Sequence, residues 1–311
     1  MPELAAIPRL GAQSGPGPLL SVVVASVNGW DVLGPTLRAL DDQEGRDRIE
    51  VIVVDVVGGV TRERVRAHRP AVELVEVDER LSIPRLRHRG VWRARGRVVA
   101  IIEDHAEVAP GWANALLEAH EGPWGAVGGA VENGRGGLVN WAAFFCEYTP
   151  YMAPVADGPA ADLPGNNIAY KRPHLLRHAH VLDEGKWESW INDRLRADGV
   201  PLASTNAAVV RHIKPFRLGH FLVQRYYFSR SYAGMRRVDQ TPSRRLLYAL
   251  GSFALPPLLL SRVLRNALRK RRHLGRLVMC LPLIALFFTV GAAGEMVGYL
   301  VGTGRSLERV E

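Results

Sequence analysis

Several features that assign a protein class directly are scarce or missing in this sequence. Cysteine occurs only twice, as Cys146 and Cys280 in unrelated contexts, which argues against a disulfide framework and fits a reducing compartment. No GxGxxG fingerprint and no Walker lysine motif is present, which disfavours a dinucleotide fold and a P-loop. The N-terminus lacks a basic start followed by an apolar run, so we predict a disordered tail over residues 1–18 rather than a signal peptide.

Acidic residues are almost missing from one part of the chain. From Arg211 to Arg276 there are 16 lysines and arginines but only one acid, Asp239. The net charge of the whole chain is +9, so the positive charge is concentrated in this segment. Such a basic block suits nucleic acid or an anionic membrane surface. Because it borders apolar segments and no base-stacking module is present, we expect an anionic membrane and no nucleic acid as the partner.

Long uncharged segments predict a membrane-associated region over residues 246–311, preceded by an amphipathic interfacial helix within 216–245. Leu246–Ser261 contains two prolines, so we expect it to be interfacial or re-entrant. Leu277–Gly294 is uncharged for 18 residues, and we expect a span or a deep hairpin bent around its glycines. Glu295 needs a partner in lipid, for which we expect an arginine. The basic linker between the segments should stay on the cytoplasmic side.

The N-terminal half alternates between short apolar runs and amphipathic segments. The apolar runs are typical of strands buried on both faces, and they cover residues 19–26, 50–55, 72–77 and 98–102. Helical segments separate them, so the order predicts an α/β fold in which a parallel sheet has right-handed crossovers. We expect this domain to extend over residues 19–215.

Ionisable side chains follow two of these predicted strands at their carboxyl ends. Asp55 ends the second strand, and Glu103, Asp104 and His105 follow the strand at 98–102. Ligands of open α/β sheets bind at this end of the strands. The triplet suits a divalent cation and the phosphates that it carries, and Asp55 can accept a hydrogen bond from a base or ribose. The alternatives are a solvated turn for the triplet and a helix cap or turn residue for Asp55.

These segments together resemble a family 2 glycosyltransferase with the GT-A fold. Arg87-His88-Arg89-Gly90 is similar to the family's Arg-Asn-x-Gly segment, Glu103-Asp104-His105 occupies the position of its Asp-x-Asp motif, and Ala109–Trp112 (APGW) also looks like the family. The resemblance implies a Rossmann-like, mostly parallel sheet flanked by helices.

The resemblance also implies roles for individual residues. The residues that it assigns to a nucleotide-sugar donor are Asn28, Asp55, Arg87, Glu103 and Asp104. Those that it assigns to a divalent cation, Mn²⁺ or Mg²⁺, are Glu103, Asp104, His105 and, after the last strand, His212. Imidazole binds Mn²⁺ readily and Mg²⁺ less so, which leaves the identity of the metal open. The alternative for His212 is a solvated histidine at the end of a strand.

Gly165, Asn166 and Asn167 form a polar loop whose amides can hydrogen-bond sugar hydroxyls, as the resemblance implies. The alternative is a turn in which asparagine adopts positive φ. Glu147 lies in an aromatic-rich segment that we expect to pack in the core, and it is a weaker candidate for acceptor contact.

Glu188 is the candidate catalytic base. Inverting glycosyl transfer needs a carboxylate that takes the proton from the acceptor hydroxyl. In the family this carboxylate lies on a helix whose later turns read Arg-Leu and then Gly, and Arg194-Leu195 and Gly199 set the same register here. The alternative is a glutamate that stabilises the helix N-terminus, with nearby Asp183 and Glu184 as further candidates for the base.

The sequence therefore predicts an inverting glycosyltransferase at the cytoplasmic (inner) membrane, with its catalytic domain facing the cytosol. The donor would be a cytosolic nucleotide sugar, and the acceptor a hydroxyl of a lipid-linked or envelope glycan. Two rivals remain at this point. A nucleotidyltransferase would need a Gly-rich phosphate loop after the first strand, which VASVNGWD does not provide. The altered Asp-x-Asp and Glu-Asp motifs leave open a non-catalytic membrane scaffold.

Overall fold

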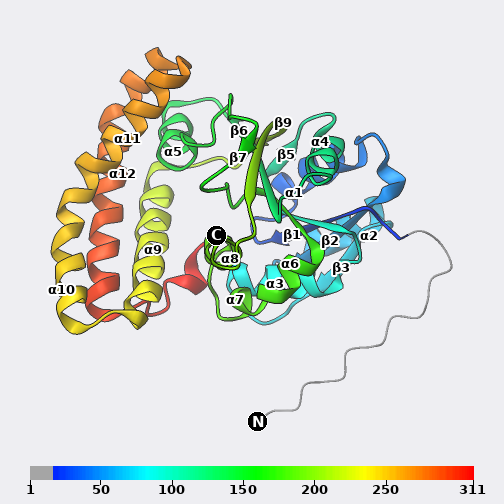
Figure 1. Ribbon diagram of the computed structural model, residues 1–311, viewed down its shortest axis with the longest axis horizontal. Helices are drawn as coiled ribbons and strands as arrows, with labels where there is room; N and C mark the ends of the chain where they lie inside the picture. The colour runs from blue at the N-terminus through cyan, green and yellow to red at the C-terminus, as the bar shows by residue number, and fades with distance from the viewer. Residues whose placement is uncertain (1–16) are drawn as a thin grey trace, which may run out of the picture.

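The computed structural model describes residues 17–311, so most of the tail expected over residues 1–18 lies outside the described part. A large sheet forms the centre of the N-terminal part, and a layer of long helices lies along one side of it (Figure 1). The first half of the sheet is parallel in the order β3-β2-β1-β4. Its strands are β1 (Leu20–Ser26), β2 (Ile49–Asp55), β3 (Glu73–Glu76) and β4 (Val98–Glu103).

Three helices connect these strands: α1 (Trp30–Asp41), α2 (Gly59–His68) and α3 (Ile83–Arg93). The predicted alternation and parallel pairing are therefore confirmed. Every residue of β1 and β2 is buried, because helices cover both faces of the sheet. Side chains alternate along each strand, so Val22 and Val24 pack in one core cluster and Val23 and Ala25 in the other.

The second half of the sheet is mixed and continues in the order β4-β8-β6-β9-β5. The pairs β4–β8, β6–β8 and β5–β9 are antiparallel, whereas β6–β9 is parallel. These strands are β5 (Ala106–Val108), β6 (Ala126–Asn133), β8 (Asn167–Lys171) and β9 (Leu202–His212), and the short β7 (Gly158–Pro159) pairs with β9. The helices of this half are α4 (Trp112–Ala119), α5 (Leu138–Tyr148), α6 (Arg172–His178), α7 (His180–Asp183) and α8 (Glu188–Ala197).

The helical layer consists of α9 (Leu218–Arg236), α10 (Pro242–Gly251), α11 (Leu255–Lys270) and α12 (Leu274–Val301). Helix α12 lies between α9 on one side and α10 and α11 on the other (Figure 1). Two helical segments, Pro242–Lys270 and Leu274–Val301, are long and apolar enough to cross a bilayer by length and composition.

Glycines explain how closely α12 packs on α9. A Cβ atom at Gly294 would lie 2.5 Å from the carbonyl oxygen of Tyr226, and one at Gly298 would lie 2.5 Å from that of Arg230. Helix α12 continues without a break through these glycines. The expected alternative of a hairpin bent around them is therefore wrong, because the glycines serve helix packing. Glu295 lies near the guanidinium groups of Arg225 and Arg236 but forms no ion pair among residues 17–311.

Helix α9, within the stretch 216–245 expected to be an interfacial helix, packs aromatic side chains against other parts of the protein. Phe221 is buried with its ring 4.5 Å from that of Phe287, between ring centroids. Farther along the helix, Phe228 packs against Trp187 at 5.4 Å and Tyr232 against Trp190 at 4.6 Å. The aromatic stripe thus packs inside the protein, because α12 covers one side of α9 and the catalytic domain covers the other.

Candidate active site

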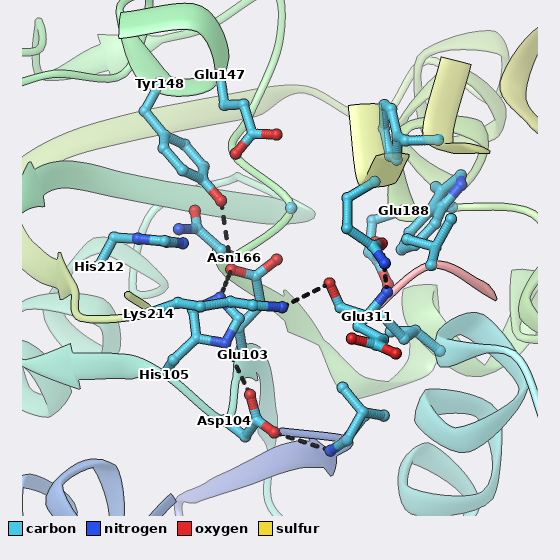
Figure 2. Close-up of a pocket in the computed structure, with 18 of the residues that line it drawn as sticks. Glu103, Asp104, His105, Glu147, Tyr148, Asn166, Glu188, His212, Lys214 and Glu311 are labelled. Atoms are coloured by element: carbon cyan, nitrogen blue, oxygen red, sulfur yellow. Dashed lines mark hydrogen bonds and ion pairs between the residues drawn. The ribbon is translucent and has the colours of Figure 1, made fainter. Parts of the chain in front are cut away.

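A cavity of about 400 Å³ opens where the carboxyl ends of β1, β4 and β9 meet helices α5, α8 and α9. Figure 2 shows the side chains that converge on it. The predicted site residues that line it are Arg87, Glu103, Asp104, His105, Gly165, Asn166, Glu188 and His212. Asn28, Asp55 and Asn167 do not line it.

Glu103, His105 and His212 form a compact group of metal-ligand type. Glu103 ends β4, His105 lies in the turn before β5, and His212 is the β9 residue that pairs with Ala106. One carboxylate oxygen and one nitrogen from each imidazole all lie within 4.8 Å of one another. A carboxylate with two imidazoles is a donor set that suits Mn²⁺ better than Mg²⁺.

Asp104 does not belong to this group, because its carboxylate points to the start of α1. One oxygen accepts the backbone N–H groups of Val27 and Asn28, each at 2.8 Å. The other accepts the Asn28 side-chain amide at 2.9 Å and lies 2.7 Å from Nδ1 of His105. A carboxylate that holds one imidazole nitrogen directs the other nitrogen to the metal position. The structure therefore places Asp104 and Asn28 behind His105 and not at the ligand position.

The two histidines have opposite electrostatic environments. Burial alone would lower the pKa of His105, but the charges and hydrogen bonds of Glu103 and Asp104 outweigh it and raise this pKa to about 9. Burial, together with the charge on His105, lowers the pKa of His212 to about 3. Burial alone would raise the pKa of Glu103, but His105 holds that pKa well below its usual range. At neutral pH His105 therefore carries a proton that a metal ion would have to displace, whereas the His212 imidazole is neutral.

Glu188 and Arg87 form a buried ion pair beside this group. Arg87 Nη1 lies 2.7 Å from Glu188 Oε2, and each side chain is only 2% exposed. Arg87 Nη2 is also 4.0 Å from Glu103, so this guanidinium lies between the base candidate and the metal-ligand group. Glu188 Oε1 and Arg87 Nε are buried and have no hydrogen-bond partner among residues 17–311. Each side chain of the pair thus keeps one unpartnered polar atom, and both side chains line the cavity.

The two asparagines at the start of β8, Asn166 and Asn167, have different surroundings. Asn166 is 1% exposed, it lines the cavity, and neither atom of its amide has a hydrogen-bond partner in residues 17–311. Asn167 instead bridges the fold: its oxygen accepts from Trp112 Nε1 at 2.9 Å, and its nitrogen donates to the carbonyls of Ala130 and Ala208 at 2.9 and 2.8 Å. Its expected contact with the sugar does not fit this position.

Asp55 is fully buried away from the cavity. One oxygen accepts from Ser26 Oγ at 2.7 Å, and the other accepts from the Gly58 N–H at 2.8 Å and Arg62 Nε at 3.0 Å. Both oxygens are therefore occupied, which fits the alternative of a turn residue. Asp183 and Glu184 are exposed and also lie outside the cavity.

Lys214 and Tyr148 also line the cavity and were not predicted as site residues from the sequence, whereas Glu147 was a weaker candidate for acceptor contact. Lys214 Nζ donates to the backbone oxygen of Glu311 at 3.0 Å, because the segment after α12 returns to the cavity (Figure 2). The Tyr148 hydroxyl lies 3.3 Å from Glu103, and burial raises the pKa of neighbouring Glu147 to about 7. Lys214 follows His212 by two residues, and side chains at this spacing point to the same side of an extended chain, so the sequence could have indicated Lys214. No local sequence pattern indicates that the segment after α12 returns to the cavity.

Comparisons with known proteins agree with this geometry. No curated protein matches the chain. Among solved structures, the mannosyltransferase PcManGT from Pyrobaculum calidifontis, in complex with GDP-Man and Mn²⁺, is similar with a TM-score of 0.58. The two are 19% identical, and the match covers 90% of this chain and 87% of that one, which supports the GT-A-like fold.

The family comparison concerns the domain that contains most of the site. Residues 21–175 match the model of glycosyl transferase family 2, and this match covers β1 through β8. The predicted family and enzyme class are therefore confirmed. The chain thus contains a glycosyl transferase family 2 domain over residues 21–175 and is a glycosyltransferase that uses a nucleotide-sugar donor.

Proposed function

We propose that this protein transfers a sugar with inversion from a nucleotide sugar to a hydroxyl of a lipid-linked or envelope-glycan acceptor at the cytosolic face of the inner membrane. One observation carries the proposal. The metal-ligand group, the unpartnered amide of Asn166 and the Arg87–Glu188 pair share one cavity. A donor diphosphate beside the metal group would place its sugar next to Asn166 and Glu188.

A divalent cation would be held by Glu103, His105 and His212, and it would supply charge that stabilises the diphosphate leaving group. Asp104 would support metal binding by these three residues, because its hydrogen bond fixes the orientation of the His105 imidazole. The donor set favours Mn²⁺ over Mg²⁺. PcManGT holds Mn²⁺ together with GDP-Man, so GDP-mannose is the first donor to test.

Glu188 would act as the base. Its Oε2 is fixed by Arg87, and its Oε1 has no partner within residues 17–311 and can accept the proton of the attacking hydroxyl. Arg87 would hold the Glu188 carboxylate in place through their ion pair and add positive charge near the diphosphate. Asn166 would donate to and accept from the hydroxyls of the transferred sugar.

The helical layer would hold the catalytic domain on an anionic bilayer. Its exposed apolar side chains over α10, the turn after it, α11 and the first half of α12 include Leu246, Leu247, Leu250, Phe253, Leu258, Leu268, Val278, Met279 and Leu286. The start of α12 is fixed to the catalytic domain, where Arg276 stacks on Trp141 at 4.4 Å from the ring centroid. The segment after α12 is also fixed, by the hydrogen bond of Arg80 to Glu308 O at 2.9 Å. Attachment at both ends favours a layer that rests on the membrane over a helix that crosses it.

A donor screen tests the proposal. The full-length protein on vesicles of phosphatidylethanolamine and phosphatidylglycerol is given GDP-mannose, UDP-glucose, UDP-galactose or dTDP-rhamnose, with Mn²⁺, Mg²⁺ or EDTA. We expect release of nucleoside diphosphate from one donor, faster with Mn²⁺ than with Mg²⁺. Full activity in EDTA would remove the proposed metal, and inversion is checked from the anomeric configuration of the product.

A further inference from the structure

A second cavity of about 520 Å³ lies between α11 and the catalytic domain. On the domain side it is lined by the 150–156 segment, by Asp162 and Pro164, and by Gly129 and Ser204 of the sheet. On the other side it is lined by Asn266, Arg269 and Lys270 of α11. These lining residues come from α11, from β6 and β9, and from the segment between α5 and β8. Neither the sequence motifs nor the family match gives this cavity a role.

Basic side chains hold α11 at the edge of this cavity. Lys270 Nζ donates to the carbonyl of Pro150 at 2.9 Å and also to that of Met152. Arg272 pairs with Glu132 at 2.6 Å and donates to the carbonyl of Ala153 at 3.0 Å. The third proton of the Lys270 ammonium stays available for a ligand, because an ammonium group carries three donors.

A row of arginines leads along α11 to the cavity. Arg262, Arg265 and Arg269 are spaced by three and four residues and therefore share one face of the helix. All three are exposed, and none forms an ion pair within residues 17–311. One acid, Asp162, lies across the cavity, but its carboxylate already accepts from the Tyr151 hydroxyl at 2.6 Å and the Leu163 N–H at 2.9 Å. The field in the cavity thus favours an anion.

The position of the cavity relates it to the reaction. Tyr151 and Asp162 line both the second cavity and the catalytic cavity, so their hydrogen-bonded pair forms the boundary between the two. The helix that supplies the arginines also exposes Leu258 and Leu268. A molecule that is held in a membrane by an apolar chain could therefore place an anionic group here and a hydroxyl in the catalytic cavity.

We propose that the second cavity binds the phosphate or diphosphate group of the acceptor, through Arg269, Lys270 and Asn266. This inference rests on the proposed glycosyl transfer, because it names the class of acceptor for that reaction. The phosphate takes no part in the chemistry: it fixes the acceptor so that a sugar or lipid hydroxyl reaches Glu188. Arg262 and Arg265 guide the anion toward the cavity.

Binding measurements on the full-length protein test the proposal without turnover. The probes are inorganic pyrophosphate and dodecyl phosphate, the latter below its critical micelle concentration. The buffer contains EDTA, so that no divalent cation binds the phosphate of a probe in the catalytic cavity. We expect Arg269→Gln and the isosteric Asn266→Asp each to weaken binding about fivefold, since a charge-assisted hydrogen bond is lost or repulsion is added at a partly solvated site. Lys270 is left unchanged because it anchors the end of α11 to the carbonyls of Pro150 and Met152.

Arg244→Gln is the matched control. It removes the same charge from an exposed position on α10, a different helix from the one that carries Arg269, and it should leave binding unchanged. Weakened binding of both probes identifies phosphate itself as the ligand, and weakened binding of dodecyl phosphate alone identifies a membrane-held phosphate. The proposal is overturned if neither probe binds, if Arg244→Gln has the same effect as Arg269→Gln, or if GDP displaces both probes.

The same variants separate this inference from the proposed function. Hydrolysis of the donor without an acceptor should be unchanged in Arg269→Gln, because Arg269 does not line the catalytic cavity. An unaltered protein that binds dodecyl phosphate but uses no donor would contradict the proposed transfer and leave the phosphate site standing. Transfer that proceeds with no measurable phosphate binding would do the reverse.

Discussion

Replacement of Glu188 by glutamine tests the catalytic assignment most directly, because it removes the base with little change of shape. Loss of a positioned general base costs about 10²- to 10⁴-fold in rate. The same change leaves the buried guanidinium of Arg87 without its partner at 2.7 Å. Two opposite charges about 4 Å apart attract by about 4 kcal/mol at an effective dielectric constant of 20. Because glutamine still accepts one hydrogen bond, we expect a loss of about 3 kcal/mol in unfolding free energy.

The two effects are separated with a second set of variants. Arg87→Met should lose similar stability, since it leaves Glu188 buried and unpaired, whereas the double variant Arg87→Met/Glu188→Leu should recover most of it. Turnover should stay low in all three. Thermal unfolding measures stability, where about 3 kcal/mol corresponds to roughly 5 °C in a protein of this size. Glu184→Gln is the exposed control and should change neither quantity.

One result would refute this reasoning. If Glu188→Gln keeps turnover within tenfold of the unaltered enzyme, another group takes the proton, and Glu188 is only the structural partner of Arg87. Glu147 would be the next residue to test, because it lines the same cavity and burial raises its pKa to about 7.

Three further outcomes are expected. Mn²⁺ affinity, measured by calorimetry between pH 6.5 and 8.5, should rise about tenfold per pH unit and level off above about 9, because the raised pKa of His105 means that a proton must leave before the metal binds; a flat profile would contradict His105 as a ligand. Gly294→Ala should lower the unfolding free energy by about 1–3 kcal/mol, because its Cβ would meet a backbone carbonyl of α9 at 2.5 Å, whereas Gly275→Ala, with no atom within 4 Å, should not destabilise α12. The double variant Leu247→Ser/Phe253→Ser should bind phosphatidylglycerol vesicles at least tenfold more weakly with unchanged melting temperature, because these side chains are 64% and 72% exposed; unchanged vesicle binding would contradict the proposed membrane face.

The parallel half of the fold could be predicted because its signal is local. The apolar runs of β1, β2 and β4 are continuous, since both faces of these strands are covered, and the helices between them fix the crossovers. The mixed half and the order of its strands depend on contacts between distant segments. Its pattern therefore indicates strands but not their neighbours.

Within the site, the directions in which successive side chains point decide which residues belong to the metal-ligand group. Glu103 and His105 are two residues apart and converge, whereas Asp104 between them points the other way, to the loop after β1. The sequence motif located all three residues, but it did not indicate that Asp104 would point away from the other two. Asp55 shows the same limit, because its partners Ser26 and Arg62 come from other elements.

The attachment of α12 at both ends has a geometric consequence. Arg276 contacts Trp141 at the start of α12, and Glu308 accepts a hydrogen bond from Arg80 after its end. The helical layer and the catalytic cavity therefore form one rigid unit. When such a unit lies on a bilayer, the height of Glu188 above the lipid surface is constant. The enzyme would thus act as a ruler, modifying only hydroxyls at one set distance from the membrane, and longer or shorter acceptors would present their ends out of reach.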